Sequence, residues 1–153
     1  MANTKNIYSY PVHITKQVLI TADASPAHVD RLSCAVDFIV LEGTLILAAL
    51  EGIVVDIKQD SNEGGEDPSY DALGNYIEIQ HNHGEYSIYE HIRQHGSLVK
   101  VGDKVKTGQV IGYSGKTGWI AHLGPHLHFD VHTYFSNKPD DYRTLKIRWK
   151  SRL

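Results

Sequence analysis

The sequence has a single cysteine, Cys34, in 153 residues. One thiol excludes an intramolecular disulfide framework and any zinc site built from several cysteines. Hydrophobic runs are short as well, and none approaches the roughly 18 residues that a transmembrane helix needs. With 41% hydrophobic and 22% charged residues, the composition is that of a globular protein without a membrane span.

The chain also lacks an excess of positive charge. Fifteen Lys and Arg residues stand against eighteen Asp and Glu residues, a formal net charge of −3. Because basic side chains on phosphates supply most nucleic-acid affinity, we expect no nucleic-acid partner. The length suits one domain over residues 1–153, since a chain of that size buries roughly two thirds of its unfolded surface. No secretory signal follows Met1, so the sequence predicts a cytoplasmic protein if Met1 is the native start.

Histidine, in contrast, is abundant, with ten residues in the chain. Imidazole is the commonest metal ligand in proteins and a proton carrier near neutral pH. Since cysteine is nearly absent, histidine and carboxylate side chains would have to hold any bound metal.

Strand signals dominate the rest of the chain. Hydrophobic stretches are short, rich in Val, Ile, Thr and Tyr, and separated by Gly, Asn and Asp. No segment of ten or more residues keeps a helical period, so we predict an all-β fold with antiparallel sheets and short hairpins. We read 60–72 as a polar loop and 146–153 as a charged edge strand, with a partner-binding tail as the alternative. The other expected strands cover residues 8–14, 17–21, 34–41, 45–57 with a turn at Glu51-Gly52, 75–80, 86–89, 99–101, 110–113 and 126–131.

The segment Gly124-Pro125-His126-Leu127-His128-Phe129 is the sharpest local feature. Side chains alternate along a strand, so His126 and His128 lie on one face about 7 Å apart. Leu127 and Phe129 then point into the opposite, apolar layer. Two such imidazoles can share a site, one as a metal ligand and the other facing the group that the metal activates. The alternative is a polar stripe that faces solvent.

Two further side chains are candidates for the same cleft. Asp37 lies in the apolar segment 35–40, where a carboxylate is costly unless it is paired, hydrogen-bonded or bound to metal. A salt bridge or a capping role would also explain it. His91 follows another predicted strand and can add a further imidazole. We assign no role to His81, His83, His95, His122 and His132.

Taken together, these motifs resemble the lysostaphin-type (LytM-like) zinc endopeptidases of bacterial cell walls. The resemblance covers about residues 28–132 in unbroken order. It implies the duplicated hybrid motif, a barrel-sandwich-like arrangement of sheets and hairpins. The segments that carry it are Asp37, Glu42-Gly43-Thr44, Glu51-Gly52-Ile53-Val54, Gly74-Asn75-Tyr76-Ile77-Glu78-Ile79-Gln80-His81, Tyr89-Glu90-His91, Val101-Gly102-Asp103-Lys104-Val105 and Gly124-Pro125-His126-Leu127-His128-Phe129.

The resemblance also implies a function and roles for single residues. Asp37 and His128 match zinc ligands, and His91 and His126 match the two catalytic histidines. The implied activity is hydrolysis of peptide bonds in peptidoglycan, or in another peptide substrate. Family members usually work in the cell envelope or outside the cell. The resemblance implies no oligomeric state.

One position departs from the family pattern. Four residues before Asp37, where the family has its first histidine ligand, this chain has Ser33. A serine hydroxyl is a poor zinc ligand, and two protein ligands fall short of the three that are typical of catalytic zinc. His28, nine residues before Asp37 in a predicted loop, is a candidate replacement. Cys34 is predicted to face away from Asp37 as a small apolar residue.

Three functions follow from these patterns. The first is a zinc-dependent peptidoglycan endopeptidase, supported by the retained Asp37, His91, His126 and His128. The second is a degenerate, non-catalytic module that binds peptidoglycan or regulates a cell-wall hydrolase, supported by Ser33. The third is a carrier that is phosphorylated on histidine, since the duplicated hybrid motif also occurs in sugar phosphotransferase proteins.

Overall fold

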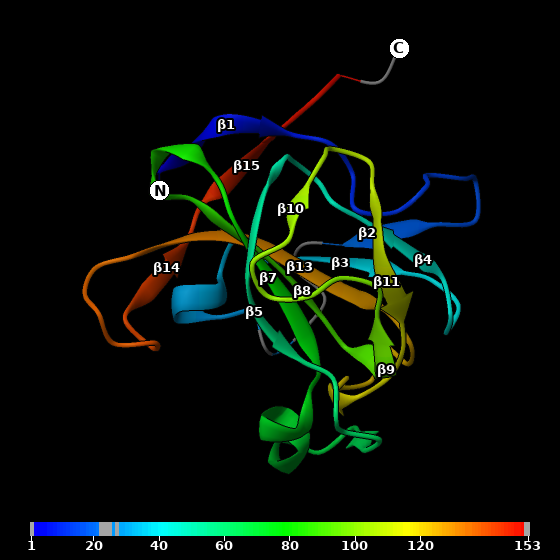
Figure 1. Cartoon of the computed structure of the whole chain (residues 1–153). Coiled ribbons are helices and arrows are strands. Elements are labelled where there is room, and N and C mark those ends of the chain that lie inside the picture. The colour runs from blue at the N-terminus through cyan, green and yellow to red at the C-terminus, as the bar shows by residue number, and fades with distance from the viewer. Residues whose placement is uncertain (1, 22–25, 27, 152–153) are drawn as a thin grey trace.

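The computed structural model describes residues 2–21, 26 and 28–151, and almost all of its regular structure is β (Figure 1). The largest sheet of the described residues runs antiparallel throughout, in the order β10-β5-β7-β8-β13-β3-β2, and β14 pairs with the far end of β13. The predicted all-β, antiparallel fold is therefore confirmed. The strands of this sheet are β2 (Leu19–Thr21), β3 (Val36–Ile39), β5 (Gly52–Lys58), β7 (Tyr76–Gln80), β8 (Tyr86–Glu90), β10 (Lys104–Val105), β13 (Leu127–Tyr134) and β14 (Tyr142–Thr144).

Smaller sheets surround it. β4 (Leu45–Leu47), β11 (Val110–Ser114) and β9 (Ile92–Ser97) form an antiparallel sheet, and β6 (Gly64–Gly65) pairs in parallel with β12 (Gly118–Trp119). β1 (Asn3–Tyr8) pairs in parallel with β15 (Lys146–Trp149), which ties the two ends of the chain together. The helices in the described part are short 3-10 turns, η1 (Asp30–Leu32), η2 (Pro68–Leu73) and η3 (Asn82–Gly84). Across that part, none is long and apolar enough to cross a membrane.

The hydrophobic core lies against one face of β13. Leu127, Phe129 and Val131 are fully buried there, as the alternating pattern predicts. Phe129 contacts the rings of Phe38 and Trp149, with centroids 6.5 and 5.8 Å apart. These contacts fix which face of β13 points into the core and which face remains for polar side chains.

Three predictions about strands were wrong. Residues 9–14 form no strand, because Pro11 cannot donate a ladder hydrogen bond, although Val12 is buried. Residues 99–101 lie in a turn that precedes β10. β9 was missed, because its three successive polar residues, Arg93, Gln94 and His95, are exposed and give no alternation. The loop predicted at 60–72 also contains β6 and most of η2.

Candidate metal centre

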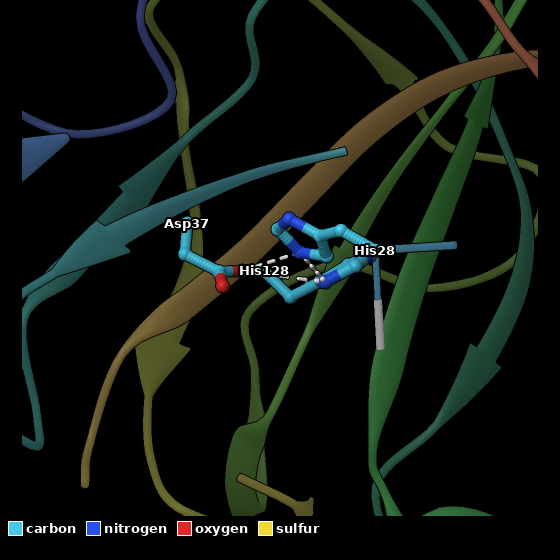
Figure 2. A group of neighbouring side chains, drawn as sticks. All are labelled: His28, Asp37 and His128. Atoms are coloured by element: carbon cyan, nitrogen blue, oxygen red, sulfur yellow. Dashed lines mark hydrogen bonds and ion pairs between the residues drawn. The ribbon is translucent and has the colours of Figure 1, made fainter. Parts of the chain in front are cut away.

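The centre is built across the middle of the large sheet. β13 runs between β3 and β8, and His128 lies directly opposite Asp37 on one side and Glu90 on the other. Directly opposed side chains of antiparallel strands lie on the same face, with Cβ atoms about 5 Å apart. His28 comes from the segment just before η1 and points at the same pair (Figure 2).

Three side chains converge closely enough to bind one ion. His28 Nε2 lies 3.2 Å from Asp37 Oδ1 and 3.4 Å from His128 Nδ1. His128 Nδ1 lies 3.3 Å from the same carboxylate oxygen. The three ligand atoms all fall within 4.8 Å of one another, and Figure 2 shows the side chains pointing inward.

Asp37 is buried without satisfied hydrogen bonds. It is 0% exposed, and within the described residues neither carboxylate oxygen has a hydrogen-bond partner of normal geometry. A buried carboxylate with that environment is costly unless a cation meets it. Burial disfavours the ionised form, but His128 and His28 outweigh burial and hold the pKa of Asp37 well below its ordinary value. The centre thus offers an ionised carboxylate and two imidazoles, a donor set that fits zinc.

Two more imidazoles stand beside this cluster. His126 Nε2 lies 3.7 Å from Asp37 Oδ1. The His91 and His126 rings pack edge to face, with their centroids 4.5 Å apart. His91 Nδ1 lies 2.7 Å from the Thr117 carbonyl oxygen, and His126 Nδ1 lies 2.8 Å from that of Gly124. A carbonyl only accepts, so both Nδ1 atoms must donate, which leaves the Nε2 lone pairs available.

Burial keeps both of these rings neutral. Burial, together with the neighbouring His126 and His128, lowers the pKa of His91 to about 3. Burial also lowers the pKa of His126, against the opposing effect of the Asp37 charge. Each ring is therefore a neutral base with a free lone pair on Nε2.

The backbone at His91 is unusual. Its φ of 69° lies in the left-handed region, which residues other than glycine rarely adopt. The His91 N–H donates to the Asn75 carbonyl at 2.9 Å, and the Asn75 side chain donates to the Ile92 carbonyl at 3.1 Å. Thr117 Oγ1 donates to the same Ile92 carbonyl at 2.7 Å. These bonds hold a strained conformation that aims the His91 ring at the centre.

The structure brings together all five side chains that the sequence put forward for the site. They are His28, Asp37, His91, His126 and His128. Ser33 is not among them, because it caps the end of η1 and is exposed. Sequence reasoning missed Glu90, Asp130 and His132, which contact the site or continue it along β13. The alternation that pairs His126 with His128 also includes Asp130 and His132, so the signal for these two was present.

Comparison with known proteins gives a consistent result. The sequence profile of peptidase family M23 matches residues 31–141. An uncharacterized metalloprotease of Buchnera aphidicola is 37% identical over 113 residues, which cover 74% of this chain and 26% of that protein. The peptidoglycan DD-endopeptidase ShyC of Vibrio cholerae is 38% identical over 95 residues, which cover 61% of this chain and 18% of that protein. The chain thus spans about a quarter or less of the length of these curated relatives.

Solved structures show the same fold. A zinc-containing peptidase from Vibrio cholerae aligns over 97% of this chain and 41% of that chain, with a TM-score of 0.61 and 26% identity. The catalytic domain of lysostaphin from Staphylococcus simulans aligns over 93% of this chain and 88% of that chain, with a TM-score of 0.55 and 30% identity.

Proposed function

The chain belongs to peptidase family M23, and from that premise we propose that it is a zinc-dependent endopeptidase that cleaves peptide bonds of bacterial cell-wall peptidoglycan. The observation that carries the proposal is the convergence of His28, Asp37 and His128 around a buried carboxylate that lacks hydrogen bonds within the described residues. Such a carboxylate is explained by a cation between the three side chains.

In this proposal His28 replaces the histidine that the family pattern has at position 33. With Asp37 and His128 it completes three protein ligands, the number typical of catalytic zinc. Zinc, when bound, supplies Lewis-acid chemistry toward water and a peptide carbonyl. In this proposal the third ligand comes from a different position in the sequence, and the set of three protein ligands is complete.

His91 and His126 are the proposed proton carriers. Each presents a neutral Nε2 lone pair, since its Nδ1 proton is held by a backbone carbonyl. One ring accepts the proton of the attacking water. That ring then donates the same proton to the leaving amine, and the other ring accepts a hydrogen bond from the second hydrogen of the water.

The proposed substrate class comes from the relatives and from the space beside the centre. ShyC is named a peptidoglycan DD-endopeptidase. A mostly apolar groove of about 580 Å³ is lined by Ile39, two residues after Asp37, and by Pro125, the residue before His126. A groove in that position can receive side chains of a peptide whose scissile bond lies at the centre.

Zinc content tests the ligand set. Wild-type protein purified without chelator should carry about one zinc ion per chain by elemental analysis. His28→Ala should lose it, because Asp37 and His128 alone hold zinc weakly. The matched control is His122→Ala, which removes an exposed histidine and should keep the zinc. A zinc-free wild type that gains zinc only after Ser33→His would contradict the role given to His28.

Hydrolysis of purified peptidoglycan tests the activity itself. Release of new amino groups should stop after chelation and return when zinc is restored. His126→Gln should keep the zinc and lose hydrolysis by roughly 10²–10⁴-fold, the usual contribution of a general acid or base. Zinc-loaded protein that cleaves no peptidoglycan and no peptide would refute the proposal.

A second candidate is a module that binds peptidoglycan without cleaving it, favoured by Ser33 at the position of the family's first ligand. It predicts co-sedimentation with peptidoglycan that survives chelation and that His126→Gln leaves unchanged. Chelator-sensitive hydrolysis would exclude it. The family match gives no support to the phosphorylated carrier.

A further inference from the structure

The polar face of β13 continues beyond the proposed metal centre. His126, His128, Asp130 and His132 alternate along it, and each is at most 4% exposed. The proposed function uses only the two histidines of the H-x-H segment. Buried charged groups that no reaction step uses need another explanation, because burial of an ionisable side chain is costly.

Asp130 and His132 belong to one chain of contacts that begins at the proposed ligand His128. Asp130 Oδ2 lies 3.5 Å from His128 Nε2, the ring nitrogen that faces away from Asp37. Asp130 Oδ1 accepts from His132 Nδ1 at 2.7 Å, and His132 Nε2 donates to Glu78 Oε2 at 2.8 Å. Tyr134 OH donates to the same Glu78 oxygen at 2.6 Å. These contacts link β13 to β7.

His132 is charged in this arrangement. Both of its ring nitrogens contact carboxylate oxygens, which only accept when ionised, so both nitrogens must carry protons. The imidazolium lies between Asp130 and Glu78 and fixes the orientation of the Asp130 carboxylate. Asp130 itself is 1% exposed, so solvent does not compete for its oxygens.

His128, at one end of this series of contacts, has a ring nitrogen whose hydrogen bonding is not satisfied in the described part of the chain. Its Nε2 is buried and, within the described residues, lacks a hydrogen bond of normal geometry. When Nδ1 of an imidazole faces a metal, Nε2 carries the proton and needs an acceptor, and a carboxylate acceptor orients the ring and raises its basicity. Glu90 also lies 3.5 Å away, but its side chain is 35% exposed, whereas Asp130 is held rigidly by His132.

We propose that Asp130 is a positioning residue that accepts the Nε2 proton of His128 and so aligns Nδ1 for the metal, with His132 and Glu78 holding Asp130 in place. This inference rests on the proposed function, since it needs a metal between His28, Asp37 and His128. It assigns a purpose to the buried charges beyond the centre.

The test is the zinc affinity of chelator-stripped protein, measured by competition with a chromophoric chelator, together with the absorption spectrum of the cobalt form. Asp130→Asn keeps the shape of the side chain but cannot accept from both imidazoles at once. We expect zinc affinity to fall by about 10–100-fold, the usual effect of removing such a partner, and the cobalt absorption bands to shift.

The matched control is Glu85→Gln. Glu85 is 2% exposed and accepts hydrogen bonds from Tyr8 and Asn6, on β1 and away from the centre. The substitution should lower the melting temperature and leave zinc affinity and the cobalt spectrum unchanged. A purely structural role for Asp130 would make the two variants behave alike.

The possible outcomes distinguish the positioning role of Asp130 from the proposed function. Wild-type zinc affinity in folded Asp130→Asn would overturn the positioning role and leave the metal centre standing. A wild type that binds no zinc would overturn the proposed function and this inference with it. If Asp130→Asn does not fold, Glu78→Gln tests the outer link; we expect zinc affinity to fall by severalfold, and an unchanged value would overturn the proposal.

Discussion

Folding stability should depend on pH through the charge of His132. The ring is 2% exposed and lies between Asp130 and Glu78. Burial disfavours protonation, but the two carboxylates outweigh burial and raise the pKa of His132 to about 9. In the unfolded chain the group titrates near its ordinary value of about 6.5. The remaining titratable groups against the ring are the phenols of Tyr86, Tyr134 and Tyr142.

The sign and size of the effect follow from these two values. Because folding raises the pKa of His132, its contribution to stability is complete below pH 6.5 and disappears as the pH rises through 9. The gap between about 6.5 and about 9, at roughly 1.4 kcal/mol for each pH unit, is about 3 kcal/mol. That is a large part of the 5–15 kcal/mol that stabilises a typical domain.

Urea denaturation of the chelator-treated protein between pH 6 and 10 measures the contribution of the His132 charge to the free energy of unfolding. The difference in free energy of unfolding between wild type and His132→Gln should be about 3 kcal/mol larger at pH 6 than at pH 10. His81→Gln is the matched control, because burial lowers the pKa of His81 and its effect on stability therefore has the opposite sign. Its difference from wild type should not grow toward pH 6. A constant difference for His132→Gln would refute the charged state of His132.

Three further outcomes are expected. Asn75→Ala removes the side-chain bonds to Ile92 and Ser61 and should lower stability by about 2–3 kcal/mol in urea denaturation, with a loss of hydrolysis that zinc does not restore. Phe38→Ala, at a fully buried core position, should lower stability by about 3–5 kcal/mol; a smaller loss would mean that the core collapses around the gap. Tyr8→Phe removes one hydrogen bond to Glu85 and should cost about 1 kcal/mol without a change in zinc content.

Much of the fold could be predicted because local alternation determines most of it. The strands that line the site, β3, β7, β8 and β13, each coincide with an apolar or alternating segment. The parallel pairing of β1 with β15 could not be foreseen, since it joins residues such as Asn3 and Lys146 from opposite ends of the chain. β9 was missed because Arg93, Gln94 and His95 are exposed, whereas its pairing with β11 involves the end residues Ile92 and Ser97.

The residues of the site were also predictable only in part. His126, His128 and Asp37 were predictable from strand periodicity and from the cost of a carboxylate in an apolar segment. His28 was only a candidate, because it precedes η1 in a segment without any period, and its position depends on tertiary contacts with Asp37 and His128. The roles of Asp130 and His132 were missed, although they continue the same alternation, because Glu78, their partner on β7, is 54 residues from His132 in the sequence.

The hydrophobic core sets the position of the proposed metal centre. A shift of one residue in the pairing of β13 would exchange its two faces. Phe129 would leave its contacts with Phe38 and Tyr89, at about 2–3 kcal/mol for a side chain of this size. The same shift would bury His128 and Asp130 among apolar side chains, at several kcal/mol for each unpaired polar group. The register that places His128 opposite Asp37 therefore needs no metal to hold it, whereas His28, which lies outside the sheet, is the ligand whose position gains most from a bound ion.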